Sequence, residues 1–209
     1  FKQPYFAVSI ADFWRRWHIS LSLWLKDYLF TPLQLKFRSY KKWSNVIALI
    51  ITFTLCGLWH GTSWTFVFWG FLHGFYMSFA LITSKQKKYL HDLFKNKKLL
   101  QSLQIIVTFF LVTFAWIFFR AENFDNAFLI LSKLFEFTSG EFTFRFIKIL
   151  LSFAVVSFLI DYLESRWNSD SILSKIKPGI RYAISLAILI IVFSYLLTAD
   201  KAPFIYAQF

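Results

Sequence analysis

The chain has 209 residues, of which 57% are hydrophobic, 22% aromatic and only 16% charged. Soluble domains carry about 25% charged residues, so the composition excludes an ordinary soluble domain and predicts an integral membrane protein with several spans. The net charge of +12 arises from lysines and arginines gathered in short segments between apolar runs, which is typical of topology signals and anionic-lipid contacts and argues against a nucleic-acid partner.

The first predicted element is an interfacial helix over residues 13–30. Its apolar residues recur every three or four positions, as on one face of a helix: Trp14, Trp17, Leu21, Trp24 and Tyr28. Tryptophan combined with basic residues favours the membrane–water boundary. We expect this helix to end at Thr31-Pro32, because the residue before a proline avoids the helical conformation. A basic loop, 36–42, follows.

Residues 46–83 contain no Asp, Glu, Lys or Arg. As one helix this run would be roughly 57 Å long at about 1.5 Å per residue, nearly twice a hydrocarbon core of about 30 Å. It must therefore break, and the glycine-containing stretch 57–63 is the natural place. We expect spans over 46–59 and 64–83. A break at membrane depth is tolerated only where protein buries the backbone or water reaches it.

The remainder of the chain alternates between charged loops and apolar runs. A loop over 84–100 carries six lysines against one acid, and 127–137 has the pattern of a short amphipathic helix. Further spans are expected over 101–119, 146–163 and 182–198. The basic loops 36–42, 84–100 and 164–181 are predicted to face the cytoplasm. The prediction is a single all-α, polytopic membrane domain over 1–209 with broken or re-entrant helices.

His60 is the first candidate for chemistry, because it lies in the predicted break between Trp59 and Gly61. Ionisable residues inside a membrane segment usually line a cavity or a reaction path. Imidazole suits general-base catalysis, since it gains and loses a proton near neutral pH. The alternative is a packed histidine that bonds to a backbone carbonyl.

The other polar candidates are less specific. His73 follows His60 by 13 residues, which on a continuous helix separates them by about 20 Å, so they share a site only if the break folds them together. A helper or packing role is expected for His73. His18 lies beside Arg15 in the interfacial helix and could simply be solvated there. Cys56 and His60 alone make a weak metal site, and no metal is expected.

Four stretches carry a resemblance to a known family: FWRRWHISLSLWLKDYLF, LCGLWHGTSWTFVFWGFLHG, WIFFRAENFDNA and PFIYAQF. In this order they resemble the membrane-bound O-acyltransferases (MBOAT). The resemblance is to the bacterial branch that includes alginate O-acetyltransferases and is related to D-alanyl transfer proteins of teichoic acid synthesis. It implies that the chain is the C-terminal half of a roughly twice longer protein.

The resemblance also implies an activity and its residues. His60 would be the catalytic residue at the waist of a tunnel and His18 a second functional residue, with His73, Trp59 and Gly61 in support. An acyl group, expected to be acetyl, would pass from a cytoplasmic thioester such as acetyl-CoA, with no bound cofactor, towards a hydroxyl of an exported polysaccharide. The expected partners are the lipid bilayer and the polysaccharide or a periplasmic acetyltransferase, in a bacterial inner membrane.

Three alternatives stay open at this point. The first is D-alanyl-type transfer to a cell-wall polymer. The second is a transporter in which the histidines relay protons; it predicts acidic residues along the spans, and only Asp161 qualifies. The third is a membrane scaffold in which the histidines merely pack.

Overall fold

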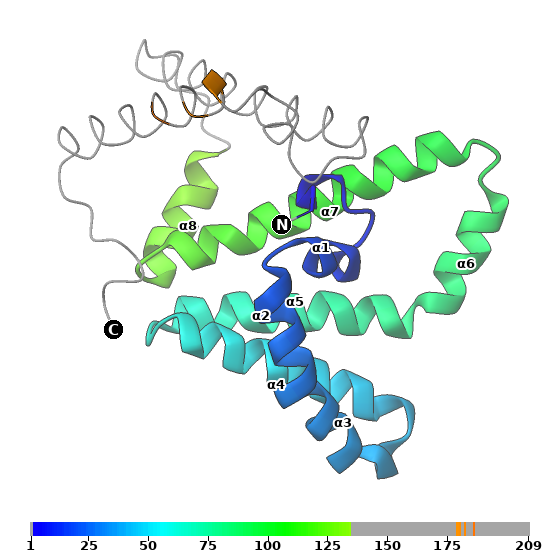
Figure 1. Ribbon diagram of the computed structural model, residues 1–209, viewed down its shortest axis with the longest axis horizontal. Coiled ribbons are helices and arrows are strands. Elements are labelled where there is room, and N and C mark those ends of the chain that lie inside the picture. The colour runs from blue at the N-terminus through cyan, green and yellow to red at the C-terminus, as the bar shows by residue number, and fades with distance from the viewer. Residues whose placement is uncertain (1, 135–178, 181, 183–185, 187–209) are drawn as a thin grey trace. The chain divides into compact units, whose positions relative to one another are not determined.

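The computed structural model describes residues 2–134 together with 179, 180, 182 and 186. Within these residues the regular structure is helical and no strand occurs, which confirms the predicted all-α class. Figure 1 shows the arrangement. The elements are η1 (Pro4–Phe6), α1 (Ile10–Arg16), α2 (Ile19–Leu25), the π-helical turn η2 (Lys26–Phe30), α3 (Thr31–Lys36), η3 (Arg38–Tyr40), α4 (Lys42–His60), α5 (Trp64–Ile82), α6 (Ser84–Leu93), α7 (Lys97–Arg120) and α8 (Phe124–Lys133).

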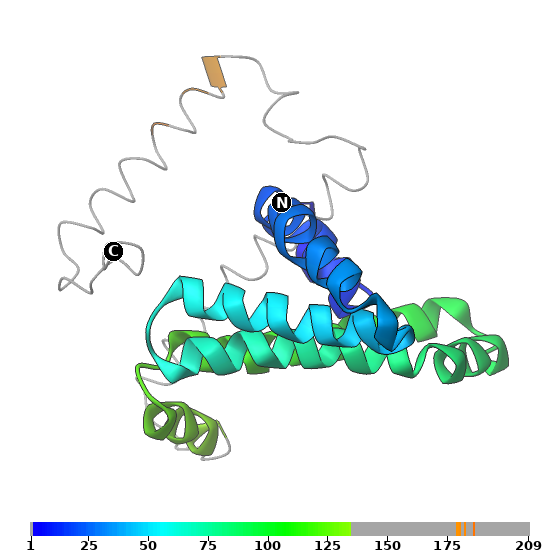
Figure 2. The same cartoon turned by 90° about the horizontal axis from the view of Figure 1, so that it is seen from below.

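The centre of the fold is a hairpin of α4 and α5, which lie side by side in Figures 1 and 2. The predicted break within 46–83 is confirmed, and it is a turn of three residues, 61–63. Gly57 lies inside α4, and a Cβ there would overlap the carbonyl oxygen of Phe66. A Cβ on Gly70 would overlap the carbonyl oxygen of Phe53 in the same way. The two glycines therefore allow the helices to pack backbone against backbone.

Three helices are long and apolar enough to cross a membrane: α4 and α5 with 19 residues each and α7 with 24. They correspond to the predicted spans 46–59, 64–83 and 101–119. Along α7 the side chains of Ile106, Val107 and Phe110 are 50%, 56% and 66% exposed, as expected of a helix that turns an apolar face to lipid. The predicted spans 146–163 and 182–198 lie outside the described residues, apart from isolated positions in the second.

Polar caps fix where several helices begin. Asn96 precedes α7, and its side-chain oxygen accepts from the N–H of Leu99 at 3.1 Å. Asn123 does the same for α8 through the N–H of Asn126, at 2.8 Å. Each cap satisfies a backbone donor that the first helical turn leaves free.

The predicted interfacial helix over 13–30 is not one helix. The chain leaves helical geometry at Trp17, and His18 has a left-handed backbone with φ 42° and ψ 56°. The predicted end at Thr31-Pro32 is also wrong, because the proline occupies the first turn of α3, where its missing N–H is not needed. We call residues 10–36 the arm. It consists of α1, α2, the π-helical turn η2 and α3.

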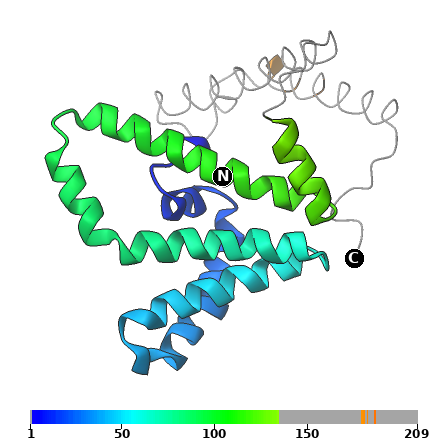
Figure 3. The ribbon, with the colours of Figure 1, turned by 180° about the vertical axis from the view of Figure 1, so that it is seen from behind.

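Two other sequence-based boundaries change. The lysine-rich segment predicted as a loop over 84–100 contains the helix α6, which Figures 1 and 3 show between the end of α5 and the start of α7. Lysine is a good helix former, and 84–93 holds neither Gly nor Pro. The amphipathic helix predicted over 127–137 is found as α8, starting three residues earlier because Asn123 caps it.

Candidate active site

His60 is the last residue of α4 and is only 7% exposed. Its ring meets three aromatic rings edge-on: Trp59 at 4.9 Å, Trp69 at 5.3 Å and Phe119 at 5.2 Å between centroids. These residues come from α4, α5 and α7, so the three membrane-length helices converge on this imidazole. The environment is apolar and strengthens electrostatic interactions with any polar group that enters it.

The turn after His60 is tied to the end of α7. Ser63 Oγ donates to the carbonyl of Glu122 at 2.9 Å, and Thr65 Oγ1 donates to the carbonyl of Ala121 at 3.0 Å. Gly61 has an extended backbone, and a Cβ there would lie 2.5 Å from Cε2 of Phe66. A glycine at 61 thus leaves room for an aromatic ring against the turn.

His18 lies within range of an electrostatic interaction with His60. It is half-buried and precedes α2 as the N-cap residue. A left-handed backbone costs an L-residue other than glycine about 1–2 kcal/mol, and such conformations cluster at functional sites. The structure thus leaves the two histidines that the family resemblance pairs within electrostatic range of each other.

His73 is fully enclosed, with 0% exposure. Its Nδ1 accepts a hydrogen bond from Trp14 Nε1 at 3.2 Å, so the proton of the neutral ring is on Nε2. Within the described residues, that buried Nε2 has no hydrogen-bond partner. The hairpin folds His73 towards His60 to the extent that both rings contact Trp69, at 5.1 Å and 5.3 Å.

Asp12 fixes the charged side of α1. It is 8% exposed and accepts from Arg16 Nε at 3.0 Å, Arg15 Nη2 at 3.4 Å and the N–H of Val8 at 3.2 Å. Burial alone would raise the pKa of Asp12, but these hydrogen bonds and the positive charge of Arg16 outweigh it and lower the pKa below its ordinary value of 3.8. Asp12 is therefore an anionic anchor of α1.

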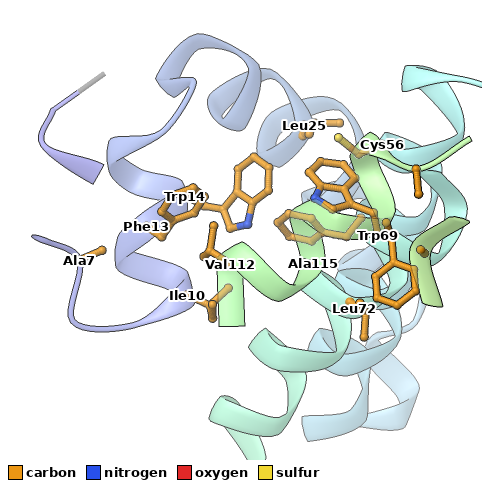
Figure 4. Packing of buried hydrophobic residues seen from close by; sticks show 14 residues of the cluster. Ala7, Ile10, Phe13, Trp14, Leu25, Cys56, Trp69, Leu72, Val112 and Ala115 are labelled. Carbon is orange, nitrogen blue, oxygen red and sulfur yellow. The ribbon is translucent and has the colours of Figure 1, made fainter. Parts of the chain in front are cut away.

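Sequence reasoning missed the aromatic residues that link the histidines. Figure 4 shows Trp14 and Trp69 among the buried residues that join the arm to the hairpin. Trp69 precedes His73 by four residues, which on a helix predicts a shared face. Trp59, expected as a supporting residue, contacts His60 and is 60% exposed. Phe119 is separated from the hairpin in sequence and no local pattern predicts its contact.

In the described part of the chain, no group of three His, Cys, Asp or Glu residues could hold a metal ion. Cys56, which the sequence places one helical turn before His60, is buried and 2% exposed.

Comparison with known proteins identifies the family. The family described as MBOAT, membrane-bound O-acyltransferase family, matches residues 1–121. The chain belongs to the MBOAT family. The match covers the arm, the hairpin and all of α7, and so all three histidines of the candidate site. The MBOAT assignment, together with three helices of membrane-spanning length, establishes an all-α integral membrane protein.

Several curated relatives are similar to the chain. A probable alginate O-acetylase of Azotobacter vinelandii is 39% identical over 147 residues, which is 68% of this chain and 26% of the relative. A peptidoglycan O-acetyltransferase of Helicobacter pylori is 42% identical over 134 residues, 64% of this chain and 24% of the relative. A teichoic acid D-alanyltransferase of Bacillus subtilis is 32% identical over 134 residues, 60% of this chain and 33% of the relative. The matched region thus spans about a quarter to a third of these MBOAT relatives.

Proposed function

We propose that this chain carries the catalytic centre of a membrane O-acyltransferase, with His60 as general base. The observation that supports the proposal best is the position of His60, buried at the end of a membrane-length helix with His18 as its electrostatic neighbour.

The reaction that fits such a base is transfer from a thioester to a hydroxyl. His60 takes the proton of the acceptor hydroxyl as its oxygen attacks the carbonyl carbon of the thioester. The tetrahedral intermediate then collapses, the carbon–sulfur bond breaks, and the departing thiolate takes the proton back from His60. The rings of Trp69 and Phe119 against His60 would limit wasteful hydrolysis by keeping bulk water from the reacting atoms.

His18 would be the second functional residue of this centre. An imidazole beside the base can hydrogen-bond either to the acceptor hydroxyl or to the oxyanion that forms on the carbonyl. It would therefore orient the acceptor or stabilise the intermediate while His60 moves the proton. This division of roles makes His60 the more sensitive of the two to substitution.

We propose acetyl as the transferred group and a carbohydrate hydroxyl of an exported or cell-surface polymer as the acceptor. Two of the relatives above are named as O-acetylating proteins, and their identities to this chain, 39% and 42%, exceed that of the D-alanyltransferase at 32%. The donor would be a cytoplasmic thioester such as acetyl-CoA. The protein would work in a bacterial cytoplasmic membrane, directly on the polymer or through a periplasmic acetyltransferase.

The nature of the acyl group can be tested on cells that carry the full-length protein. Cell-surface polymers are isolated from cells with and without the gene and treated with mild alkali, and the released acids are identified by mass spectrometry. Acetate that depends on the gene supports the proposal. Gene-dependent release of D-alanine would establish the alternative, and equal release from both strains would contradict an acyltransferase.

A further inference from the structure

A buried hydrogen bond connects two parts of the chain that are 59 residues apart. Trp14 Nε1 in α1 donates to His73 Nδ1 in the middle of α5, at 3.2 Å. Trp14 is 6% exposed and His73 is 0% exposed. Phe13, the residue before Trp14, stacks on the same imidazole with 12° between the ring planes. Helix α1 is thereby fixed to the hairpin at one ring.

Each partner of this bond is linked to one of the two site histidines, Trp14 through the helix that precedes His18 and His73 through the ring of Trp69. On the arm, the N–H of Trp17 bonds to the carbonyl of Phe13 at 2.7 Å and closes α1, and His18 follows directly. The position of His18 is therefore set by the position of α1. On the hairpin, Trp69 lies one helical turn before His73, and its ring contacts both His73 at 5.1 Å and His60 at 5.3 Å.

The hydrogen bond from Trp14 requires one particular tautomer of His73. Nδ1 can accept only if it carries no proton, so a single donor, the Trp14 indole, selects both the tautomer and the ring orientation. A side chain that only filled space would need neither a lone pair at this position nor an indole N–H opposite it. The hydrogen bond thus restricts the orientation of α1 on α5 more than apolar packing alone would.

We propose that His73 is a positioning residue: its hydrogen bond with Trp14 sets His18 against His60. This inference rests on the proposed function for its catalytic consequence. The part of the inference that concerns the distance between His18 and His60 does not depend on any activity. His73 does not need to touch substrate to act in this way.

The catalytic consequence is tested with the full-length protein in membranes, measuring acyl transfer at varied donor concentration. Trp14→Phe removes the donor and keeps a ring; His73→Leu removes the acceptor; His73→Asn retains an oxygen acceptor near the Nδ1 position. We expect Trp14→Phe and His73→Leu each to lower kcat about 10- to 100-fold, with the KM for the donor nearly unchanged, because a misplacement of about 1 Å has effects of this size. His73→Asn should recover most of the rate.

Two further comparisons distinguish positioning from packing. The double variant of Trp14→Phe and His73→Leu should be no slower than His73→Leu alone, since both remove one interaction. Trp43→Phe serves as the matched control, because Trp43 is 49% exposed at the other end of α4. Multiplying losses in the double variant, or no rescue by Asn, would overturn the proposal.

The effect on the distance between His18 and His60 is tested without any activity. His18→Cys and His60→Cys are combined in a protein whose other cysteines are replaced, and a short bismaleimide is used to cross-link the pair. Efficient cross-linking that falls severalfold with Trp14→Phe, but not with Trp43→Phe, supports the positioning role. Unchanged cross-linking with Trp14→Phe overturns it. If the natural protein transfers no acyl group while the cross-linking behaves as expected, the proposed function fails and the positioning role stands.

Discussion

Asp12 shows how a single buried carboxylate stabilises helix α1 locally. It accepts hydrogen bonds from Arg15, Arg16 and the Val8 amide, and its pKa is lowered by them against the opposing effect of burial. A group whose folded pKa lies below its unfolded value stabilises the fold above that unfolded value. The stabilisation disappears as the pH falls through the folded value.

Asp12→Asn is therefore expected to lower the free energy of unfolding at pH 7 by about 1.5–3 kcal/mol, since hydrogen bonds to charged groups contribute about this much. The difference between the variant and the natural protein should shrink as the pH falls below 3.8, the ordinary pKa of the group. Thermal unfolding in detergent from pH 7 to pH 3 measures it. A difference that stays constant or grows towards acid pH would contradict the anchoring role of the charge.

His18 has a left-handed backbone and a proposed chemical role. A suitable substitution can remove the imidazole while keeping the backbone conformation. Asparagine tolerates the left-handed region better than most residues and lacks an imidazole. His18→Asn should fold normally, with membrane abundance and melting temperature close to those of the natural protein, yet lose acyl transfer by about 10-fold or more. Valine, which is β-branched and strained there, should lower abundance as well. Full activity in His18→Asn would remove His18 from the site.

At the scale of elements, the α4–α5 hairpin depends on close backbone contact. A Cβ at Gly70 meets the carbonyl oxygen of Phe53 in a helix that cannot move aside locally, whereas at Gly74 the nearest contact is looser, at 3.0 Å from the Cα of Ile50. Among the described residues, none lies within 4 Å of a Cβ on Gly179. The three glycines therefore form a graded series.

We expect Gly70→Ala to destabilise the protein by about 1–3 kcal/mol or more, as overpacking does, with Gly74→Ala less affected and Gly179→Ala unchanged. Thermal stability of the detergent-solubilised variants measures the order. If Gly70→Ala were as stable as Gly179→Ala, the two helices would not pack as closely as described.

The helices and turns also show which parts of the fold could be predicted from the sequence. The existence of a break follows from length, because 38 residues without Asp, Glu, Lys or Arg exceed one membrane crossing, and the glycine-containing stretch 57–63 indicates its place. The break at His18 could not be predicted, since the three-to-four periodicity of tryptophans continues across it and histidine gives no turn signal. The left-handed conformation at His18 accompanies a tertiary contact, Trp14 with His73, that no local pattern contains.

The candidate site, too, could be predicted from the sequence only in part. The resemblance paired His60 with His18, and in the structure the two lie within range of an electrostatic interaction. Trp69 could have been found from its four-residue spacing to His73. Phe119 could not, because it reaches His60 only through the packing of α7 on α5.

At the scale of the whole molecule, the described residues hold α7 against His60 and the arm against the nearby His73. The hydroxyls of Ser63 and Thr65 hold the turn to the end of α7, and the Trp14–His73 bond holds the arm. Three separate segments thus fix the surroundings of His60. Such pre-organisation is what a base needs in order to meet a hydroxyl and a thioester in one geometry.

The most direct test of the account is His60→Ala in the full-length protein, in cells where its membrane abundance equals that of the natural protein. Ester-linked acyl groups on the exported polysaccharide are quantified, with His91→Ala, a substitution in α6, as the control. The account predicts that His60→Ala lowers these esters by at least about 10²-fold, as removal of a general base does, while His91→Ala leaves them unchanged. Normal esters in His60→Ala would contradict the assignment of His60 as the catalytic base.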